Sequence, residues 1–348
     1  MRRDTPPVSI DVYEVTTERD DLVDALVAAR NATLPEINPD DPPVGADEMR
    51  SELAKRSTLK RVRAWVALLD GRPAGDLTFE LEDDEANRHV ASSDWFAVVP
   101  GLRRRGVGDA LLRTALASLA EEGRTSLLLW GQKAQPDVAT PYAARLGLVE
   151  RTEERCSRVR TDEIPDDVIE SWLQAGRSRD DGYRVVQFSD RCPDDLLDAY
   201  VQAVAAMQDI PVDDLEWTPP EADAALLRSR EENWAVGRLT PARTLVLAPD
   251  GSGAGLSELF VSGFRPPLAY QGDTGVVAAH RGRGLGRWLK AENLRFAQQL
   301  APGFEVIETY NAQSNPWMLD INVAMGFRAH VMWRGFQGDL AAALAVVA

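Results

Sequence analysis

Apolar positions along this chain recur with two spacings, one typical of strands and one typical of helices. In the first half, residues 62–69 and 74–81 read as two strands on either side of a tight turn at 70–73. Residues 107–121 then carry apolar side chains four positions apart, the buried stripe of an amphipathic helix. Short strands that alternate with helices predict an α/β (α+β) chain.

The predicted elements follow the same order in both halves of the chain. The first half predicts strands at 8–16, 62–69, 74–81, 95–99, 126–130 and 148–159, and helices at 20–30, 46–55, 107–121 and 138–146. The second half predicts strands at 183–188, 243–248, 255–263, 274–278 and 306–310, and helices at 194–207, 220–233, 285–300 and 316–325. Residues 160–181 are polar and form the best linker, although 166–175 also suit a short helix. We therefore expect domains at 7–162 and 183–348 with a linker at 163–182.

Composition narrows the class of protein. The chain has 348 residues, of which 44% are hydrophobic and 27% charged, and this suits two soluble globular domains. Its formal net charge of −16 argues against nucleic acid as a partner and is compatible with a cationic substrate such as an amine. Two cysteines argue against a disulfide framework, and the three scattered histidines show no metal-ligand spacing. We see no signal peptide and no apolar run that could cross a membrane, so we expect a cytoplasmic protein.

One motif, Arg-x-x-Gly-x-Gly, occurs at 103–108 and again at 281–286, about half the chain apart. Both copies lie between a predicted strand and a predicted amphipathic helix. Glycines let backbone N–H groups approach a pyrophosphate, the helix N-terminus adds partial positive charge, and arginines add charged donors. The alternative is a turn that only caps a helix. The motif lacks the Gly-Lys-Ser/Thr of nucleotide triphosphatases and the glycine spacing of dinucleotide folds.

With these loops, both halves resemble the GNAT acetyltransferase superfamily, whose signature is Arg/Gln-x-x-Gly-x-Gly/Ala after a strand. The second half is the closer match, since it also has Asp273-Thr274 before the strand and the segment 309–322 followed by Met325-Gly326-Phe327. It is similar to the C-terminal unit of tandem GNAT proteins of bacteria with high genomic G+C content. The resemblance implies two GNAT domains, each a mixed, largely antiparallel sheet flanked by helices.

The resemblance also implies acetyl-CoA as co-substrate and no metal. Coenzyme A would enter between two splayed parallel strands, 95–99 with 126–130 and 274–278 with 306–310. In the second half the implied cofactor-binding residues are Val276, Val277, Ala278, Arg281, Gly282, Arg283, Gly284, Leu285, Gly286, Asn311 and Asn315. In the first half they are Val98, Val99, Arg103, Arg104, Arg105, Gly106, Val107 and Gly108. For the two asparagines, the alternative is turn or capping chemistry at the helix around Pro316.

Acetyl transfer to an amine needs a base, and we favour Glu258 on the predicted strand 255–263. Glu308 and Asp273 are the second choices, and each of the three has the alternative of a solvated strand-edge carboxylate. In the first half, Asp94, Glu80 and Glu82 are the corresponding candidates. That half lacks the asparagine pair, so we expect it to bind coenzyme A less well or to act as a scaffold.

The acid that protonates the thiolate is not assigned. Many relatives place a tyrosine four residues before the glycine of the last helix, whereas this chain has Asn322 and Ala143 at those positions. Tyr142 is one position away, and Tyr310 lies on a predicted strand. A thiol has a pKa near 8.5, so its thiolate is a tolerable leaving group without help.

These expectations combine into one hypothesis with two alternatives. The hypothesis is a cytoplasmic N-acetyltransferase that acts on a small-molecule amine, with its chemistry in the second half, without nucleic acid or membrane as partners, and as a monomer or homodimer. The first alternative is an acyl-CoA-binding regulator or sensor without turnover, favoured by the missing tyrosine. The second is an acetyltransferase of protein N-termini or lysines.

Overall fold

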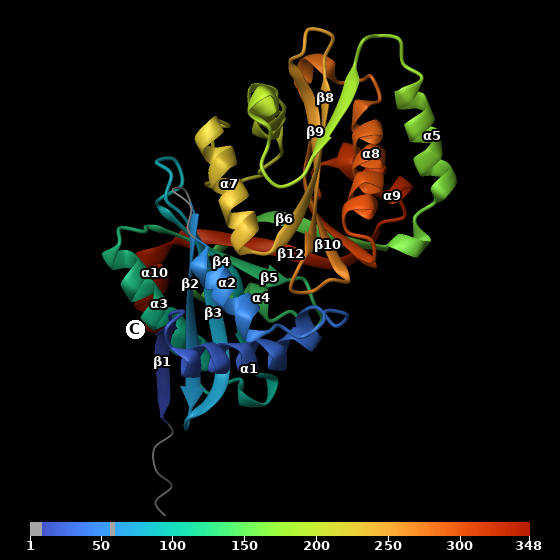
Figure 1. Ribbon diagram of the computed structural model, residues 1–348. Helices are drawn as coiled ribbons and strands as arrows, with labels where there is room; N and C mark the ends of the chain where they lie inside the picture. Colours follow the sequence, from blue (N-terminus) through green and yellow to red (C-terminus); the bar gives the residue numbers. More distant parts are fainter. Residues whose placement is uncertain (1–8, 56–59) are drawn as a thin grey trace, which may run out of the picture. The chain divides into compact units, whose positions relative to one another are not determined.

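The computed structural model describes residues 9–55 and 60–348, which divide into two units (Figure 1). The first unit comprises the chain up to Thr152 together with Leu215–Trp217 and Trp333–Ala348. The second comprises Glu153–Asp214 and Thr218–Met332. The domain boundaries expected from the sequence, 7–162 and 183–348, describe two continuous stretches and stay a prediction. The two units instead divide the chain after Thr152 and assign residues 215–217 and 333–348 to the first unit. Of the expected first strand, Val8 lies outside the described residues.

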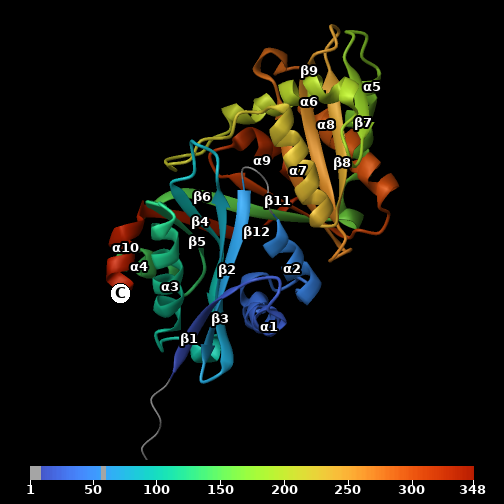
Figure 2. The ribbon, with the colours of Figure 1, turned by 60° about the vertical axis from the view of Figure 1, so that its left-hand side comes forward.

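The first unit is built on a sheet with the strand order β1-β2-β3-β4-β5-β12. Its strands are β1 (Ile10–Val15), β2 (Lys60–Leu69), β3 (Arg72–Glu82), β4 (Val90–Val98), β5 (Ser126–Gln132) and β12 (Arg328–Asp339). Its helices are α1 (Asp20–Ile37), α2 (Ala46–Ala54), α3 (Val107–Glu121), α4 (Ala139–Arg145) and α10 (Leu340–Val347). The neighbours are antiparallel except β4 and β5, which are parallel. Figure 2 shows α1 and α2 on one side of β2 and β3, with α3 and α10 on the other.

The second unit repeats this plan with the strand order β6-β11-β10-β9-β8-β7. Its strands are β6 (Val149–Arg160), β7 (Arg184–Phe188), β8 (Leu239–Leu247), β9 (Gly253–Ser262), β10 (Leu268–Val276) and β11 (Val306–Ala312). Its helices are α5 (Asp166–Arg177), α6 (Leu197–Val204), α7 (Ala224–Val236), α8 (Leu285–Leu300) and α9 (Pro316–Ala324). β10 and β11 are parallel and the other neighbours are antiparallel. Figure 1 shows α7 on one side of β8 and β9 and α8 with α5 on the other.

The two units exchange their last strands. β12, which closes the second half of the sequence, pairs with β5 of the first unit from Trp333 to Asp339. β6, which closes the first half, pairs with β11 of the second unit from Glu154 to Arg160. The cores follow the same exchange, because Phe336 packs into the first core and the chain just after β6 packs into the second. Both sheets are therefore mixed and largely antiparallel with helices on their faces, as expected.

In each unit the central parallel pair of strands separates after a short stretch of pairing. β4 and β5 pair only through residues 90–92 and 126–128, and β10 and β11 pair only through 268–270 and 306–308. The register between β9 and β10 shifts between Gln271 and Thr274, so two residues of β10 lie opposite Glu258 of β9. In the first unit the register of β3 and β4 shifts at the same place, with Asp94 as the extra residue of β4. Backbone groups beyond these points have no parallel partner strand.

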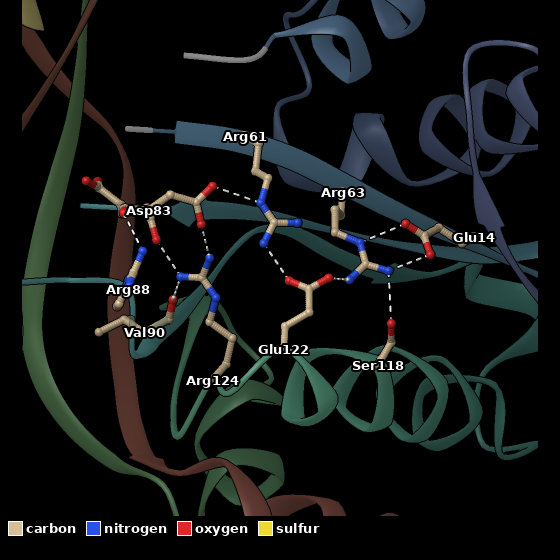
Figure 3. Close-up of polar contacts among 10 residues, drawn as sticks. Glu14, Arg61, Arg63, Asp83, Arg88, Val90, Ser118, Glu122 and Arg124 are labelled. Carbon is tan, nitrogen blue, oxygen red and sulfur yellow. Dashed lines mark hydrogen bonds and ion pairs between the residues drawn. The ribbon is translucent and has the colours of Figure 1, made fainter. Parts of the chain in front are cut away.

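Ion pairs hold the far end of α3, the helix that starts at the first loop (Figure 3). Arg61 and Arg63 of β2 each lie 2.5 Å from a carboxylate oxygen of Glu122, the residue after α3. Arg63 also donates to Ser118 of α3 at 3.0 Å, and Arg124 donates to the Val90 carbonyl oxygen of β4 at 3.2 Å. Because these contacts share partners, the network fixes α3 on the sheet more firmly than isolated surface pairs would.

Several elements differ from the sequence prediction. β10 begins at Leu268, before the expected start at 274, because the polar bulge at Gly272 and Asp273 hides the strand pattern. α7 begins at Ala224 rather than 220. α10 was not predicted, and its apolar face packs in the first core through Leu340. Among the described residues no helix is long and apolar enough to cross a membrane.

Candidate active site

The two Arg-x-x-Gly-x-Gly loops have the same backbone geometry. Each begins with a short 3-10 turn, Pro100–Leu102 or Ala278–His280, and ends where α3 or α8 starts after a left-handed glycine. The φ angle is 85° at Gly106 and 76° at Gly284, a region that glycine enters without strain. The first-turn N–H groups of each helix have no partner within the helix. A Cβ built on Gly284 meets no heavy atom within 4 Å, so the space next to this glycine is open.

The first arginine of each loop is held by the protein itself. Arg281 Nε donates to the Val276 carbonyl oxygen at 2.9 Å, and its Nη2 lies 2.7 Å from Asp209 Oδ2. Arg103 makes the same two contacts in the first unit, to the Val98 carbonyl oxygen at 2.9 Å and to Glu36 at 2.5 Å. These arginines therefore fasten the end of the strand to the segment after α6 or to the end of α1. The expected role of these arginines in binding phosphate stays a prediction.

The other loop arginines are exposed. Arg104, Arg105 and Arg283 have exposed side chains, and none forms an ion pair with another described residue. The backbone carbonyl oxygen of Arg283 accepts a hydrogen bond from Arg179 at 2.8 Å. The side chain of Arg283 is exposed to solvent. Arg104 has a left-handed φ of 62°, where Gly282 stands in the second loop with 77°. Gly282 adopts this left-handed conformation without the strain that the Arg104 side chain causes in the first loop.

Glu258 is a buried carboxyl on β9, opposite the bulge of β10. Only 2% of the residue is exposed. The Tyr200 hydroxyl of α6 donates a hydrogen bond to its Oε1. Burial raises the pKa of Glu258 to about 7; the charge of Asp273 adds to this rise, while the Tyr200 hydrogen bond and the guanidinium groups of Arg230 and Arg243 oppose it. A carboxyl with this pKa is divided between its acid and base forms at neutral pH.

A buried arginine on β8, Arg243, contributes to the electrostatics of this carboxyl. Arg243 of β8 has no exposed surface and forms an ion pair with Glu231 of α7, with Nη1 2.7 Å from Oε1. Its guanidinium carbon lies 4.6 Å from the Phe188 ring centroid, 5.2 Å from that of Trp234 and 5.6 Å from that of Tyr200. Aromatic faces stabilise a cation that water cannot reach. The arginine thus places a fixed positive charge beside the tyrosine that contacts Glu258.

The other two candidate bases of the second unit have salt-bridge partners. Glu308 of β11 is buried and accepts from Arg158 Nε of β6 at 2.6 Å. Asp273 lies 3.0 Å from Arg230 Nη1 of α7. Glu258 has no ion pair with any described residue within hydrogen-bonding range, and its hydrogen bond comes from a neutral hydroxyl. Of the three, Glu258 is the carboxyl whose environment suits proton uptake near neutral pH.

The first unit has no carboxyl at the place of Glu258. The strand register puts Thr78 there, opposite Trp95 and next to the bulge. Arg30 of α1 fills the space in front: it donates to Asp76 at 2.7 Å and to Thr78 at 2.9 Å, and its guanidinium lies 4.3 Å from the Trp95 ring. Burial raises the pKa of the nearby Asp94 to about 6, with a further contribution from Glu80. Of the other first-half candidates, Glu80 pairs with Lys60.

Both implied cofactor-binding asparagines, together with Tyr142 and Tyr310, have contacts within the protein. Asn315 caps α9 by accepting from the Met318 N–H at 3.3 Å, so the capping alternative describes its side-chain oxygen. Asn311 accepts from Asn322 at 2.7 Å. In the first unit the Tyr142 hydroxyl donates to Asp109 at 2.9 Å. Tyr310 is 45% exposed, and burial of its hydroxyl together with Glu308 raises its pKa.

The sequence alone did not single out Tyr200, Arg243 or Lys290. Tyr200 and Arg243 come from α6 and β8, far from Glu258 along the chain, and no local pattern links them. Lys290 is fully buried on α8. A signal existed for this residue, since it lies four positions before the buried Leu294 within an apolar helix stripe.

Comparison with known proteins bears on the fold and the family. The model of the acetyltransferase (GNAT) family matches residues 30–148, which lie in the first half, rather than the second half whose motif we judged closer. No curated protein matches the sequence.

Solved structures match over nearly the whole chain. A tandem GNAT protein from the clavulanic acid biosynthesis pathway, solved without acetyl-CoA, has a TM-score of 0.76 at 22% identity, covering 95% of this chain and 99% of that one. A GCN5-related N-acetyltransferase from Sphaerobacter thermophilus has a TM-score of 0.65 at 15% identity, covering 95% and 96%. A probable N-acyltransferase from Enterococcus faecalis V583 has a TM-score of 0.55 at 10% identity, covering 98% and 74%. At these identities the likeness shows the fold.

Proposed function

We propose that this chain is a tandem GNAT acyltransferase whose second unit acetylates the amine of a small molecule with acetyl-CoA as donor. The match of residues 30–148 to the acetyltransferase (GNAT) family model and the similarity in fold over 95% of the chain support this proposal. The acyl-CoA would lie where β10 and β11 separate, with its pyrophosphate on the N–H groups of loop 281–286. Arg283 would supply charge to the phosphates. The amine would approach from the α6 and α7 face of the sheet.

One observation supports placing the chemistry in the second unit. Glu258 is a buried carboxyl with a pKa of about 7 at the bulge of the second unit, whereas Thr78 and the Arg30 guanidinium occupy the same place in the first. A cation beside the reacting amine would oppose the positive charge that develops on its nitrogen. We therefore place the chemistry in the second unit and a scaffold or binding role in the first.

In the proposed reaction, Glu258 takes a proton from the ammonium form of the acceptor, directly or through a water. The free amine attacks the thioester carbonyl carbon to give a tetrahedral intermediate. The carbon–sulfur bond then breaks with its electron pair leaving on sulfur, and the remaining extra proton of the nitrogen passes to the leaving thiolate or to solvent. Tyr200 holds one carboxylate oxygen of Glu258 and leaves the other for the acceptor. Because the pKa of Glu258 is about 7, a substantial share of the carboxyl is ionised at pH 7. The ionised form is also basic enough to accept a proton.

The test is thiol release from acetyl-CoA across a panel of small amines, polyamines and amino sugars included. The proposal expects release that depends on an amine, together with one acetylated product per thiol. If acetyl-CoA binds but no amine raises the rate, the chain is a sensor or regulator without turnover. If only peptides with a free N-terminus or lysine raise it, the acceptor is a protein.

A further inference from the structure

A lysine lies buried in the second unit without a carboxylate partner. Lys290 belongs to α8, the helix that starts at loop 281–286, and only 1% of it is exposed. It forms no ion pair with any described residue, and burial lowers its pKa to about 7. A buried charge without a partner is costly, and an apolar side chain of the same length would fill this place more cheaply. The contacts of its amino group show what it does there.

Lys290 fixes the orientation of a buried amide. Its Nζ donates to Asn322 Oδ1 of α9 at 2.7 Å, and it lies 5.5 Å from the ring centroid of Phe327. In its ammonium form Lys290 has donors only, so the oxygen of the Asn322 amide faces it in that form. The Asn322 Nδ2 group then points the other way, where it donates to Asn311 Oδ1 at 2.7 Å. Asn322 is 2% exposed, so water cannot replace either contact.

Asn311 stands at the outer end of this chain of hydrogen bonds. It is half-buried near the end of β11, three residues past Glu308, the last position that pairs with β10. Its oxygen is occupied by Asn322, and its Nδ2 group has no hydrogen-bond partner among the described residues. The two hydrogen bonds behind it therefore favour an Asn311 that offers donors, and not an acceptor, beside the stretch of β11 that has no β10 partner.

We propose that Lys290 is a positioning residue for acetyl-CoA, and that it acts through Asn322 to hold the Asn311 amide as a donor to a carbonyl oxygen of the pantetheine arm. This inference rests on the proposed function in one respect, because it takes the acyl-CoA to lie between β10 and β11. It assigns Lys290 no contact with the substrate. It explains why a lysine occupies the core of α8.

The experiment measures acetyl-CoA binding to the full chain by titration calorimetry without an acceptor. Gly284→Asp identifies the binding event that belongs to the second unit. The double variant Lys290→Met/Asn322→Leu replaces the buried pair by apolar side chains and leaves no unpaired polar atom at those two positions. It should melt within a few degrees of the wild type yet bind acetyl-CoA about tenfold more weakly, the effect of losing one hydrogen bond. Asn311→Asp, which removes the donor but keeps the size, should weaken binding to a similar extent.

Combination of the variants separates positioning from a merely structural role. Added to Asn311→Asp, the double variant should weaken binding by less than about twofold more, because both changes interrupt one path. A double variant that melts like the wild type and binds within about twofold of it would overturn the proposal, as would losses that multiply.

Should the double variant not fold, Lys290→Gln and Lys290→Met are compared instead. Glutamine keeps a donor for Asn322 and methionine does not, so equal binding by the two would contradict the proposal. A wild type that binds acetyl-CoA but never turns over would remove the proposed function and leave this inference intact.

Discussion

Tyr200 donates its hydroxyl hydrogen to the carboxylate of Glu258, and both side chains are buried between α6 and the bulge of the second sheet. This contact stabilises the ionised form of a carboxyl whose burial favours the protonated form. The guanidinium of Arg243, which lies 5.6 Å from the Tyr200 ring centroid, lowers the pKa of Glu258 further. The balance leaves Glu258 with a pKa suited to a general base.

Tyr200→Phe removes that hydrogen bond and leaves the ring. The pKa of Glu258 should then rise by about one unit, the worth of a hydrogen bond to a charged group. In the pH profile of kcat/KM the acidic limb should move to higher pH by the same amount. Tyr13→Phe, an exposed tyrosine of β1 in the first unit, is the control and should leave the profile unchanged. An unmoved acidic limb in Tyr200→Phe would separate Tyr200 from the base.

The pH dependence of protein stability should show the raised pKa of Glu258 independently of activity. The pKa of Glu258 is raised from 4.5 to about 7 on folding, so the native state binds the proton more tightly than the unfolded chain. The stability contributed by this group is full below the unfolded pKa and is lost as the pH rises through 7. Glu258→Gln does not titrate, so its melting temperature relative to the wild type should increase between about pH 5 and about pH 8. Thermal melts of both proteins measure this, and the opposite trend would show that Glu258 is not held in its acid form.

The local pattern of apolar residues and glycines in the sequence was enough to predict the two Arg-x-x-Gly-x-Gly loops and most of the strands and helices around them. The left-handed glycines Gly106 and Gly284 lie where the motif placed them, at the start of α3 and α8. These features depend on neighbours in the sequence, namely apolar spacing and the freedom of glycine.

Contacts between distant segments were not predictable. The sequence names Glu258 as an acid on a strand but not Tyr200 as its partner, since α6 reaches it only after the sheet has formed. The exchange of β6 and β12 is also invisible in the sequence, because no local pattern shows whether β6 pairs with β11 or β12 with β5. The ion pair of Arg281 with Asp209 could not be predicted for the same reason, because Asp209 lies in a turn far from the loop in the sequence.

The two loops allow a matched test of which unit does the chemistry. Gly284→Asp puts a carboxylate where the pyrophosphate is proposed to lie, and it should raise the KM for acetyl-CoA by at least about tenfold through charge repulsion and strain. Gly284→Ala adds the same left-handed strain without the charge and should have a smaller effect. Gly106→Asp is the same change in the first unit and should leave kcat unchanged. Activity that survives Gly284→Asp and fails in Gly106→Asp would move the chemistry to the first unit.

Arg30 should matter for stability rather than for turnover. It is buried against Asp76, and its removal would leave that carboxylate buried without a partner. Arg30→Met should therefore destabilise the first unit by about 3–5 kcal/mol, measured by denaturant unfolding. Arg19→Met, which breaks the exposed pair with Asp21, should cause no measurable loss. If Arg30→Met instead left stability intact and changed the acidic limb of the pH profile, Arg30 would belong to the chemistry.

The central claim is that Glu258 is the base of an N-acetyltransfer in the second unit. The most direct measurement is amine-dependent thiol release by Glu258→Gln, with acetyl-CoA binding measured on the same sample. We predict a fall in kcat of about 10²-fold or more, as for the loss of a general base, with the dissociation constant of acetyl-CoA unchanged. A variant that binds acetyl-CoA normally and keeps its turnover would contradict the account.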